Sequence, residues 1–351
     1  MEIGTIHIVL TTYCNLGCKG CYQDEKEILN KKEDFNLNDH KENIKFLFNK
    51  FITENKQVKI SFFGGEPLLK INNIKKVIRF LKKEKLLPDM VSIPTSGGPN
   101  QNLVDSGLEL IKFIKKTLPE TTLNFSLSHD GPVSLETRNQ TLDNLNNSFR
   151  KIYALEKEID KITPNIVLNL LPQVIEEDYL TKTNDYLLYT IEKVLTFRIP
   201  HLLQPNSNLD TNKFQQACRI FLDRFSNSDI ENLPKIFKDY YDRMISPLPE
   251  RNVDYNWCQA GVNHFALTNI KDKTFTGCEY LNKDSLELYN QMSNECNNCP
   301  INYYCSKPCL KSIEVSLNQF KRHCSVRKII FNEVRRFLNI RRMNANPRIP
   351  K

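Results

Sequence analysis

The stretch Cys14-Asn15-Leu16-Gly17-Cys18-Lys19-Gly20-Cys21-Tyr22 lies close to the N-terminus and holds three of the chain's eleven cysteines. It follows the strand-like run Thr5 to Thr11. Three thiolates on one short loop can bind three irons of a [4Fe–4S] cluster, which leaves the fourth iron open to a small molecule. Short cysteine motifs also occur in zinc clips or as unrelated buried thiols, so the loop alone leaves these alternatives open.

Length and composition are those of a globular protein with one large and one smaller domain. The chain has 351 residues, of which 40% are hydrophobic and 26% charged. It contains no run of eighteen or more apolar residues and no signal-like N-terminus, so we expect a cytoplasmic protein without membrane spans. The net charge of +8 is spread along the chain, which favours acidic partners only weakly and does not imply nucleic acid.

The placement of the cysteines indicates metal binding. A disulfide framework is not expected in the cytosol, where thiols are kept reduced. Seven cysteines fall between Cys258 and Cys324, where an even spread would place about two. Only Cys218 stands alone, on the amphipathic stripe of Phe214, Ala217 and Phe221, and we predict it to be a core residue.

Short runs rich in Val, Ile, Leu and Phe alternate with helical stripes over the first two hundred residues. The stripes of Ile44 to Phe51, Ile74 to Leu81 and Leu145 to Ile152 have the helical period. This alternation predicts an α/β fold, a partial (β/α)6 TIM-like barrel with a small cysteine-rich domain behind it. The six predicted strands are Ile6–Thr11, Val58–Phe63, Met90–Thr95, Leu123–Ser128, Ile166–Leu171 and Val194–Ile199.

Changes in pattern predict four segments. They are a barrel over 1–200, a helical bridge over 201–256, a metal-held domain over 257–325, and a C-terminal helix and tail over 326–351. In the last segment Ile330, Val334, Phe337 and Leu338 form a narrow apolar stripe, which predicts a helix docked on the protein surface.

The second predicted strand ends in Gly64-Gly65-Glu66-Pro67. Two glycines let backbone groups approach a ligand closely, although a plain turn with Pro at a helix start has the same sequence. The cysteine run followed on the next strand by Gly-Gly-Glu-Pro resembles the radical S-adenosylmethionine (radical SAM) enzymes. The resemblance implies that Cys14, Cys18 and Cys21 hold the cofactor-cleaving [4Fe–4S] cluster, and that Gly64–Pro67 hold the methionine amino group of the cofactor.

The resemblance extends to further cofactor contacts. Pro94-Thr95-Ser96-Gly97 is similar to the Thr-Asn-Gly of many relatives, with Ser96 in place of Asn. Ser128-His129-Asp130-Gly131-Pro132 is similar to the Ser-x-Asp-Gly-Pro segment, which places Ser128 and Asp130 near the cofactor ribose; His129 is a local variation without a catalytic role. Arg138 is expected to bind the cofactor carboxylate, and Tyr22, which closes the cysteine run, to lie against the cofactor.

The seven C-terminal cysteines resemble the SPASM domain, which follows radical SAM domains in peptide-modifying enzymes and holds two auxiliary [4Fe–4S] clusters. The resemblance assigns Cys296, Cys299, Cys305 and Cys324 to the distal cluster. It assigns only Cys258, Cys278 and Cys309 to the nearer one, which leaves an iron there for a substrate thiolate. Lys273 replaces a usual Gly, and nineteen residues separate Cys258 from Cys278, more than is typical. A pair of structural zincs has the same sequence pattern.

These resemblances imply an enzyme that generates a 5′-deoxyadenosyl radical from S-adenosylmethionine and abstracts hydrogen from a peptide or protein. The expected outcome is a thioether or carbon–carbon crosslink, or oxidation of Cys or Ser, with Glu279 as a base. The expected reductant is a protein such as flavodoxin or ferredoxin. Strand one begins too early for a leader-binding module, so we expect leader recognition by the bridge, by a separate leader-binding protein, or not at all. A radical SAM dehydrogenase or rearrangement enzyme for a small molecule, and a non-enzymatic metal protein that binds nucleic acid, are the alternatives.

Overall fold

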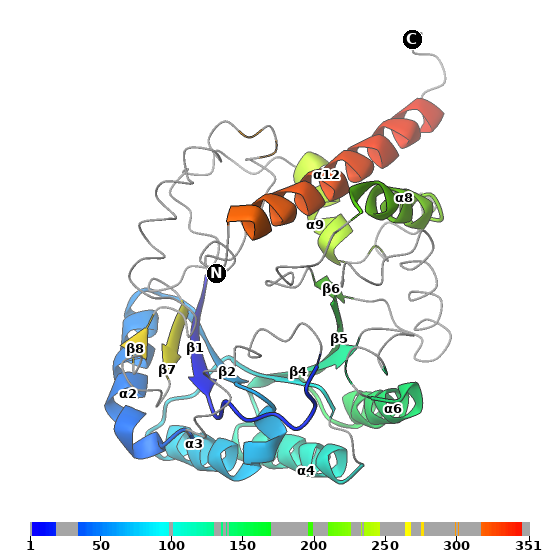
Figure 1. Ribbon diagram of the computed structural model, residues 1–351. Coiled ribbons are helices and arrows are strands. Elements are labelled where there is room, and N and C mark those ends of the chain that lie inside the picture. The colour runs from blue at the N-terminus through cyan, green and yellow to red at the C-terminus, as the bar shows by residue number, and fades with distance from the viewer. Residues whose placement is uncertain are drawn as a thin grey trace. The chain divides into compact units, whose positions relative to one another are not determined.

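The predicted alternation of strands and helices is present in the computed structural model of the chain (Figure 1). Contacts divide the chain into two units, Met1–Val167 with Cys258–Leu281 and Leu168–Trp257 with Asn282–Lys351. The four predicted segments stay a prediction. The structure describes residues 2–18, 34–97, 101–129, 140–169, 196–198, 210–225, 235–245, 264–267, 275–276 and 317–345, and positions 135, 138, 233, 299 and 301.

The first unit is built on an open, mostly parallel sheet. Its strands lie side by side in the order β5-β4-β3-β2-β1-β7-β8. The pairs β3–β4, β2–β3, β1–β2 and β1–β7 are parallel, and β7–β8 is antiparallel. The sheet does not close on itself among the described strands, so the predicted α/β class with a partial barrel is confirmed. The strands are β1 (Ile3–Val9), β2 (Gln57–Phe63), β3 (Met90–Thr95), β4 (Thr122–His129), β5 (Ile162–Asn169), β7 (His264–Leu267) and β8 (Phe275–Thr276).

The six predicted strands are present with some shifted ends, such as β1, which begins three residues and ends two residues before the predicted Ile6–Thr11, and β7 and β8 were not predicted. Strand β5 begins at Ile162, four residues before the predicted start, because Pro164 interrupts the apolar run from which the prediction was made. No strand was predicted at β7. Its four residues are too few to stand out locally, and they form a strand by pairing in register with Thr5 to Ile8 of β1.

Four helices follow one another around the outer side of this sheet (Figure 1). Each predicted stripe that the structure describes is buried: Ile44, Leu47, Phe48 and Phe51 on α2, and Ile74, Val77, Ile78 and Leu81 on α3, are 0% exposed. The Asn36 side chain caps α2 by accepting a hydrogen bond from the N–H of Asn38 at 3.2 Å. The helices are α2 (Leu37–Thr53), α3 (Ile71–Lys83), α4 (Gln101–Thr117) and α6 (Leu142–Glu158), with a short 3₁₀ turn η1 (Pro67–Lys70) before α3.

The second unit is mainly helical in its described part, with one short strand. The long helix α12 packs on both α8 and α9. The predicted apolar stripe of Ile330, Val334, Phe337 and Leu338 is buried on α12, as expected. Among the described helices, none combines the length and apolarity needed to cross a membrane. The elements are β6 (Thr196–Arg198), α8 (Thr211–Leu222), α9 (Lys235–Ile245) and α12 (Leu317–Ala345).

A buried carboxylate joins α8 to α12. Glu333 on α12 is 1% exposed. It accepts hydrogen bonds from Gln215 at 2.7 Å, from Arg219 at 3.1 and 3.2 Å, and from Arg336 at 2.7 Å. Burial opposes the charged form, but the bonds from Arg219, Gln215 and Arg336 outweigh it and hold the pKa of Glu333 below its ordinary value. This cluster therefore stabilises the helical unit as an ionised network.

Candidate functional site

The cysteine loop leaves the sheet at the carboxyl end of β1, the edge where chemistry gathers in parallel α/β folds. Just after β1, the backbone of Leu10 makes two hydrogen bonds. Its N–H donates to the Phe63 carbonyl at the end of β2, at 2.8 Å, and its own carbonyl accepts from the Phe35 N–H at 2.9 Å. These two hydrogen bonds fix the backbone four residues before Cys14. The thiols of Cys14 and Cys18 are both partly exposed.

The Gly64-Gly65 turn holds the cysteine loop by close backbone contact. The N–H of Gly65 donates to the Thr11 carbonyl at 2.8 Å, and the N–H of Glu66 donates to the Tyr13 carbonyl at 3.2 Å. A Cβ atom would come within 2.3 Å of the Thr11 carbonyl oxygen at position 64 and within 2.0 Å of the Tyr13 carbonyl oxygen at position 65. The glycines were predicted to allow approach to a ligand; in the structure they allow the two motifs to lie against each other.

The Glu66 carboxylate is buried and fully bonded within the protein. It is 1% exposed. One oxygen accepts from the Leu68 N–H at 3.0 Å and the Thr95 hydroxyl at 2.7 Å. The other accepts from the Ser96 N–H at 2.9 Å and the Ser96 hydroxyl at 2.5 Å. A carboxylate has about four acceptor sites, so Glu66 ties the end of β2 to the end of β3. Its expected bond to the cofactor ammonium stays a prediction, and it would have to replace one of these four.

Two side chains beyond β4 complete this edge. Gln140 is 1% exposed, and its side-chain N–H donates to the Ser96 carbonyl at 2.9 Å. Its Oε1 is buried and accepts no hydrogen bond within the described chain. Arg138 is 7% exposed, and its Nη1 lies 4.0 Å from the Cys18 sulfur. Sequence reasoning named Arg138 and missed Gln140, because a Gln two residues further along carries no motif.

The remaining predicted cofactor contacts divide into two groups. Pro67 is buried at the start of η1, and Ser128 lies half-buried near the end of β4, next to the strand that carries Thr95. Tyr22, Asp130 and the predicted base Glu279 lie outside the described residues.

Most predicted metal ligands also lie outside the described part. Within it, Cys299 and Cys324 belong to the second unit and are partly exposed. The described ranges bring no three His, Cys, Asp or Glu side chains together as a metal site. The ligands that lie outside are Cys21, Cys258, Cys278, Cys296, Cys305 and Cys309.

The remaining cysteine is confirmed as a core residue. Cys218 on α8 is 0% exposed. Burial raises the pKa of its thiol well above the ordinary value, and the negative charge of Glu333 raises it further. Its full burial on the apolar face of α8 is what a core residue shows.

The described residues fit a thiolate-bound iron site. Cys14 and Cys18 supply sulfur atoms on one clamped loop, and the Arg138 guanidinium beside Cys18 attracts a thiolate electrostatically. The unbonded Oε1 of Gln140 offers an acceptor for a polar ligand group at the same edge.

Comparison with known proteins assigns the N-terminal part. Residues 3–142 match the 4Fe-4S single cluster domain family. The chain is 28% identical over 179 residues to the radical SAM cyclopropyl synthase TigE of Paramaledivibacter caminithermalis, which is 48% of this chain and 36% of that protein. It is 40% identical over 82 residues to an uncharacterized protein of Methanocaldococcus jannaschii, which is 23% of this chain and 26% of that protein. The match thus spans about a third or less of these curated relatives.

Solved structures share the fold over most of the chain. The structure of anSMEcpe with bound AdoMet has a TM-score of 0.65 at 16% identity, covering 97% of this chain and 95% of that one. Streptococcus suis SuiB bound to S-adenosylmethionine has a TM-score of 0.53 at 14% identity, covering 89% and 74%. At these identities the likeness shows that this chain shares the fold of the two solved structures.

Proposed function

We propose that this chain, a radical SAM protein by its N-terminal domain and its fold, cleaves S-adenosylmethionine reductively and uses the resulting radical on a peptide or protein. The observation that carries the proposal is the direct contact between the cysteine loop and the Gly64-Gly65 turn at the carboxyl edge of the sheet. The cysteine loop and the Gly-Gly turn are each a weak indication of function alone. In the structure they meet through backbone hydrogen bonds, at the edge that also carries the Arg138 guanidinium and the unbonded Oε1 of Gln140.

The roles of the chain's own residues follow from their positions. Cys14, Cys18 and Cys21 would hold a [4Fe–4S] cluster, which when bound supplies the electron that splits S-adenosylmethionine into methionine and a 5′-deoxyadenosyl radical. Arg138 keeps the thiolate charge of Cys18 balanced. Gln140 offers Oε1 to a donor group of the cofactor.

The peptide substrate is proposed from the resemblance of the C-terminal cysteine pattern to SPASM domains. Two auxiliary clusters on the seven cysteines would bring the total to three, or about twelve irons per chain. In this proposal the product is an oxidised peptide with a thioether or carbon–carbon crosslink or an oxidised Cys or Ser. Glu279 takes the proton, and a flavodoxin- or ferredoxin-like reductant and a leader-binding protein act as partners.

Formation of 5′-deoxyadenosine by anaerobically purified, reduced protein tests the first part. The variant Cys14→Ala/Cys18→Ala/Cys21→Ala should make none, whereas the matched control Cys218→Ala should retain it. Activity that survives in the triple variant contradicts the assignment of the cluster. A colourless, zinc-containing wild type contradicts the radical proposal altogether.

Mass spectrometry tests the second part. Short peptides encoded beside the gene, co-expressed with the enzyme, should lose two hydrogens. Steady 5′-deoxyadenosine formation with every such peptide unchanged, but with a small molecule dehydrogenated, would instead favour the small-molecule alternative.

A further inference from the structure

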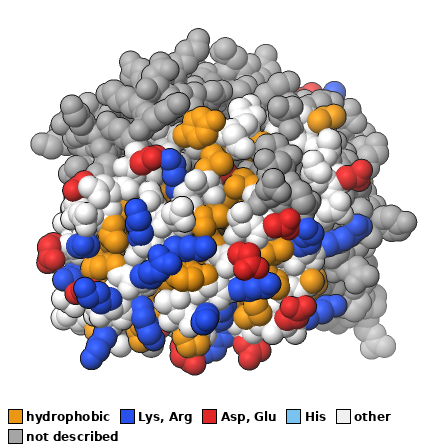
Figure 2. Space-filling model, turned by 90° about the horizontal axis from the view of Figure 1, so that it is seen from below, with side chains coloured by type: hydrophobic (Ala, Val, Ile, Leu, Met, Phe, Trp, Pro, Cys, Tyr) orange, Lys and Arg blue, Asp and Glu red, His pale blue; other side chains and the backbone are white. Residues whose placement is uncertain are grey.

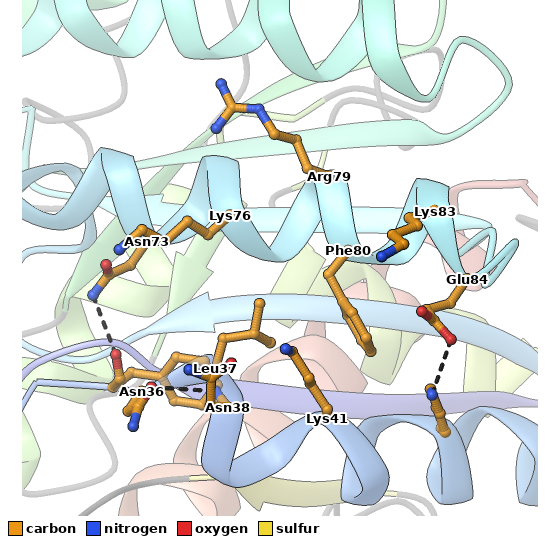
Figure 3. A pocket seen from close by; sticks show the side chains of 12 residues that line it. Asn36, Leu37, Asn38, Lys41, Asn73, Lys76, Arg79, Phe80, Lys83 and Glu84 are labelled. Atoms are coloured by element: carbon orange, nitrogen blue, oxygen red, sulfur yellow. Dashed lines mark hydrogen bonds and ion pairs between the residues drawn. The ribbon is translucent and has the colours of Figure 1, made fainter.

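A groove lined mainly by polar and basic side chains runs between α2 and α3 on the outer side of the first unit. It has a volume of about 470 Å³ and is lined from α2 by residues from Leu37 to Lys45 and from α3 by residues from Asn73 to Lys83. Figure 3 shows Lys41 reaching from α2 towards α3, with the Phe80 ring and Lys83 on the α3 side. No part of the proposed active site uses this groove.

The groove carries an excess of positive charge. Its lining holds one carboxylate, Glu84, which already pairs with Lys45 at 2.9 Å. In the described ranges Lys41, Lys76 and Lys83 form no close ion pair, and the single charge of Glu84 is shared by Lys45, Lys83 and Lys41. Lys and Arg side chains also dominate the helical face around it, with fewer acidic ones between them (Figure 2).

Arg79 does not add to the charge inside the groove. It points away from α2 in Figure 3, and its guanidinium lies 5.1 Å from the centre of the Phe113 ring on α4. The three lysines are therefore the groups that an acidic partner would meet.

One end of the groove lies next to the cysteine loop. Phe35 and Asn36 line that end, and the Phe35 N–H is bonded to the Leu10 carbonyl. Leu10 is four residues before Cys14, a path of at most about 14 Å even in fully extended chain. A partner held by the groove thus lies beside the loop that carries the first two thiols.

We propose that this groove, defined by Lys41, Lys76 and Lys83, docks the acidic surface of a small one-electron carrier protein. The proposal rests on the proposed function. The carrier gives up one electron and is oxidised by one, the cluster of the cysteine loop accepts that electron, and no bond forms or breaks. Carrier complexes bury little surface and depend on charge complementarity for rapid encounter.

The position of the groove favours a carrier over a peptide substrate. Helices α2 and α3 cover the outer side of the sheet (Figure 1), whereas a substrate must reach the radical at the carboxyl edge. An electron carrier needs only to come close to the cysteine loop.

The test compares two variants of equal charge change in the reconstituted enzyme. The variant Lys41→Glu/Lys76→Glu reverses the charge of two lysines in the groove. The control Lys116→Glu/Lys157→Glu reverses the charge of two exposed lysines on α4 and α6. Flavodoxin with its reductase and NADPH serves as the protein donor, and dithionite as the small one. At low salt we expect the flavodoxin concentration for half-maximal 5′-deoxyadenosine formation to rise about tenfold in the groove variant and less than twofold in the control. Both variants should match the wild type with dithionite, which also shows that they are folded.

Calorimetry measures the binding of oxidised flavodoxin without turnover. The dissociation constant of the groove variant should exceed that of the wild type by about the same factor of ten, and this difference should become smaller as salt is added. Equal affinity in the groove and control variants overturns the proposal. So does unchanged flavodoxin affinity with weakened peptide binding, because the groove then serves the substrate. If the wild type makes no 5′-deoxyadenosine with dithionite, the proposed function fails, and the calorimetry alone still decides whether the groove binds the carrier.

Discussion

Replacing Glu66 with Gln should destabilise the sheet edge, because no orientation of an amide can satisfy the bonds that the carboxylate makes. Each carboxylate oxygen accepts from one backbone N–H, that of Leu68 on one side and that of Ser96 on the other. Gln has one oxygen and one NH₂ group, so one of these two N–H groups would face a second donor in either orientation.

The expected cost can be worked from these contacts. A buried donor left without a partner costs about 1–3 kcal/mol, and a bond to a charged acceptor that becomes neutral loses about another 1 kcal/mol. We therefore expect Glu66→Gln to lower the free energy of opening at this edge by about 2–4 kcal/mol. Ser96→Ala, which removes the hydroxyl and keeps the Ser96 N–H bond, should cost only about 1 kcal/mol.

Hydrogen exchange of the Leu68 and Ser96 amides measures this locally, without requiring the whole chain to unfold in two states. Both amides should exchange faster in Glu66→Gln, and less so in Ser96→Ala. The reasoning is refuted if exchange at both amides matches the wild type while the S-adenosylmethionine concentration for half-maximal activity rises. Glu66 would then act on the cofactor ammonium, as the family resemblance implies.

Three further predictions test other contacts. Gly65→Ala should lower iron content, because its Cβ would overlap the Tyr13 carbonyl oxygen; Gly107→Ala, where the nearest atom is a flexible leucine methyl at 3.2 Å, should keep the iron. Cys218→Ala should leave iron per chain unchanged and cost about 1–2 kcal/mol in urea unfolding, as a small core truncation; a fall in iron would make it a ligand. Because the pKa of Glu333 is lowered by folding, its stabilisation is present above the ordinary value of 4.5 and is lost as pH falls through the lower folded value. Glu333→Gln should flatten the acid side of the stability curve of α8 and α12, and an unchanged acid slope would contradict the network.

Much of this architecture could be predicted from the pattern of neighbouring residues in the sequence. The buried stripes of α2 and α3 recur with the helical period, and β3 coincides with its predicted bounds, because each element must bury one face against the same core. Cys218 could be separated from the other cysteines for the same reason, since it lies on an apolar stripe.

Other features depend on residues that are distant in the sequence. Strand β7 is recognisable only by its partner β1, and Gln140 only by its bond to the Ser96 carbonyl. The groove between α2 and α3 exists because two helices that are each ordinary in sequence lie side by side.

The cysteine spacing indicated a metal-binding loop, because metal ligation demands particular residues at fixed separations. The role of the Gly-Gly-Glu-Pro turn in binding a ligand came from the family resemblance, and it stays a prediction. The sequence did not reveal that the turn holds the loop. That depends on Gly65 lying against the Tyr13 backbone and on four donors meeting at Glu66, contacts that arise only when β1, β2 and β3 end at the same edge of the folded sheet.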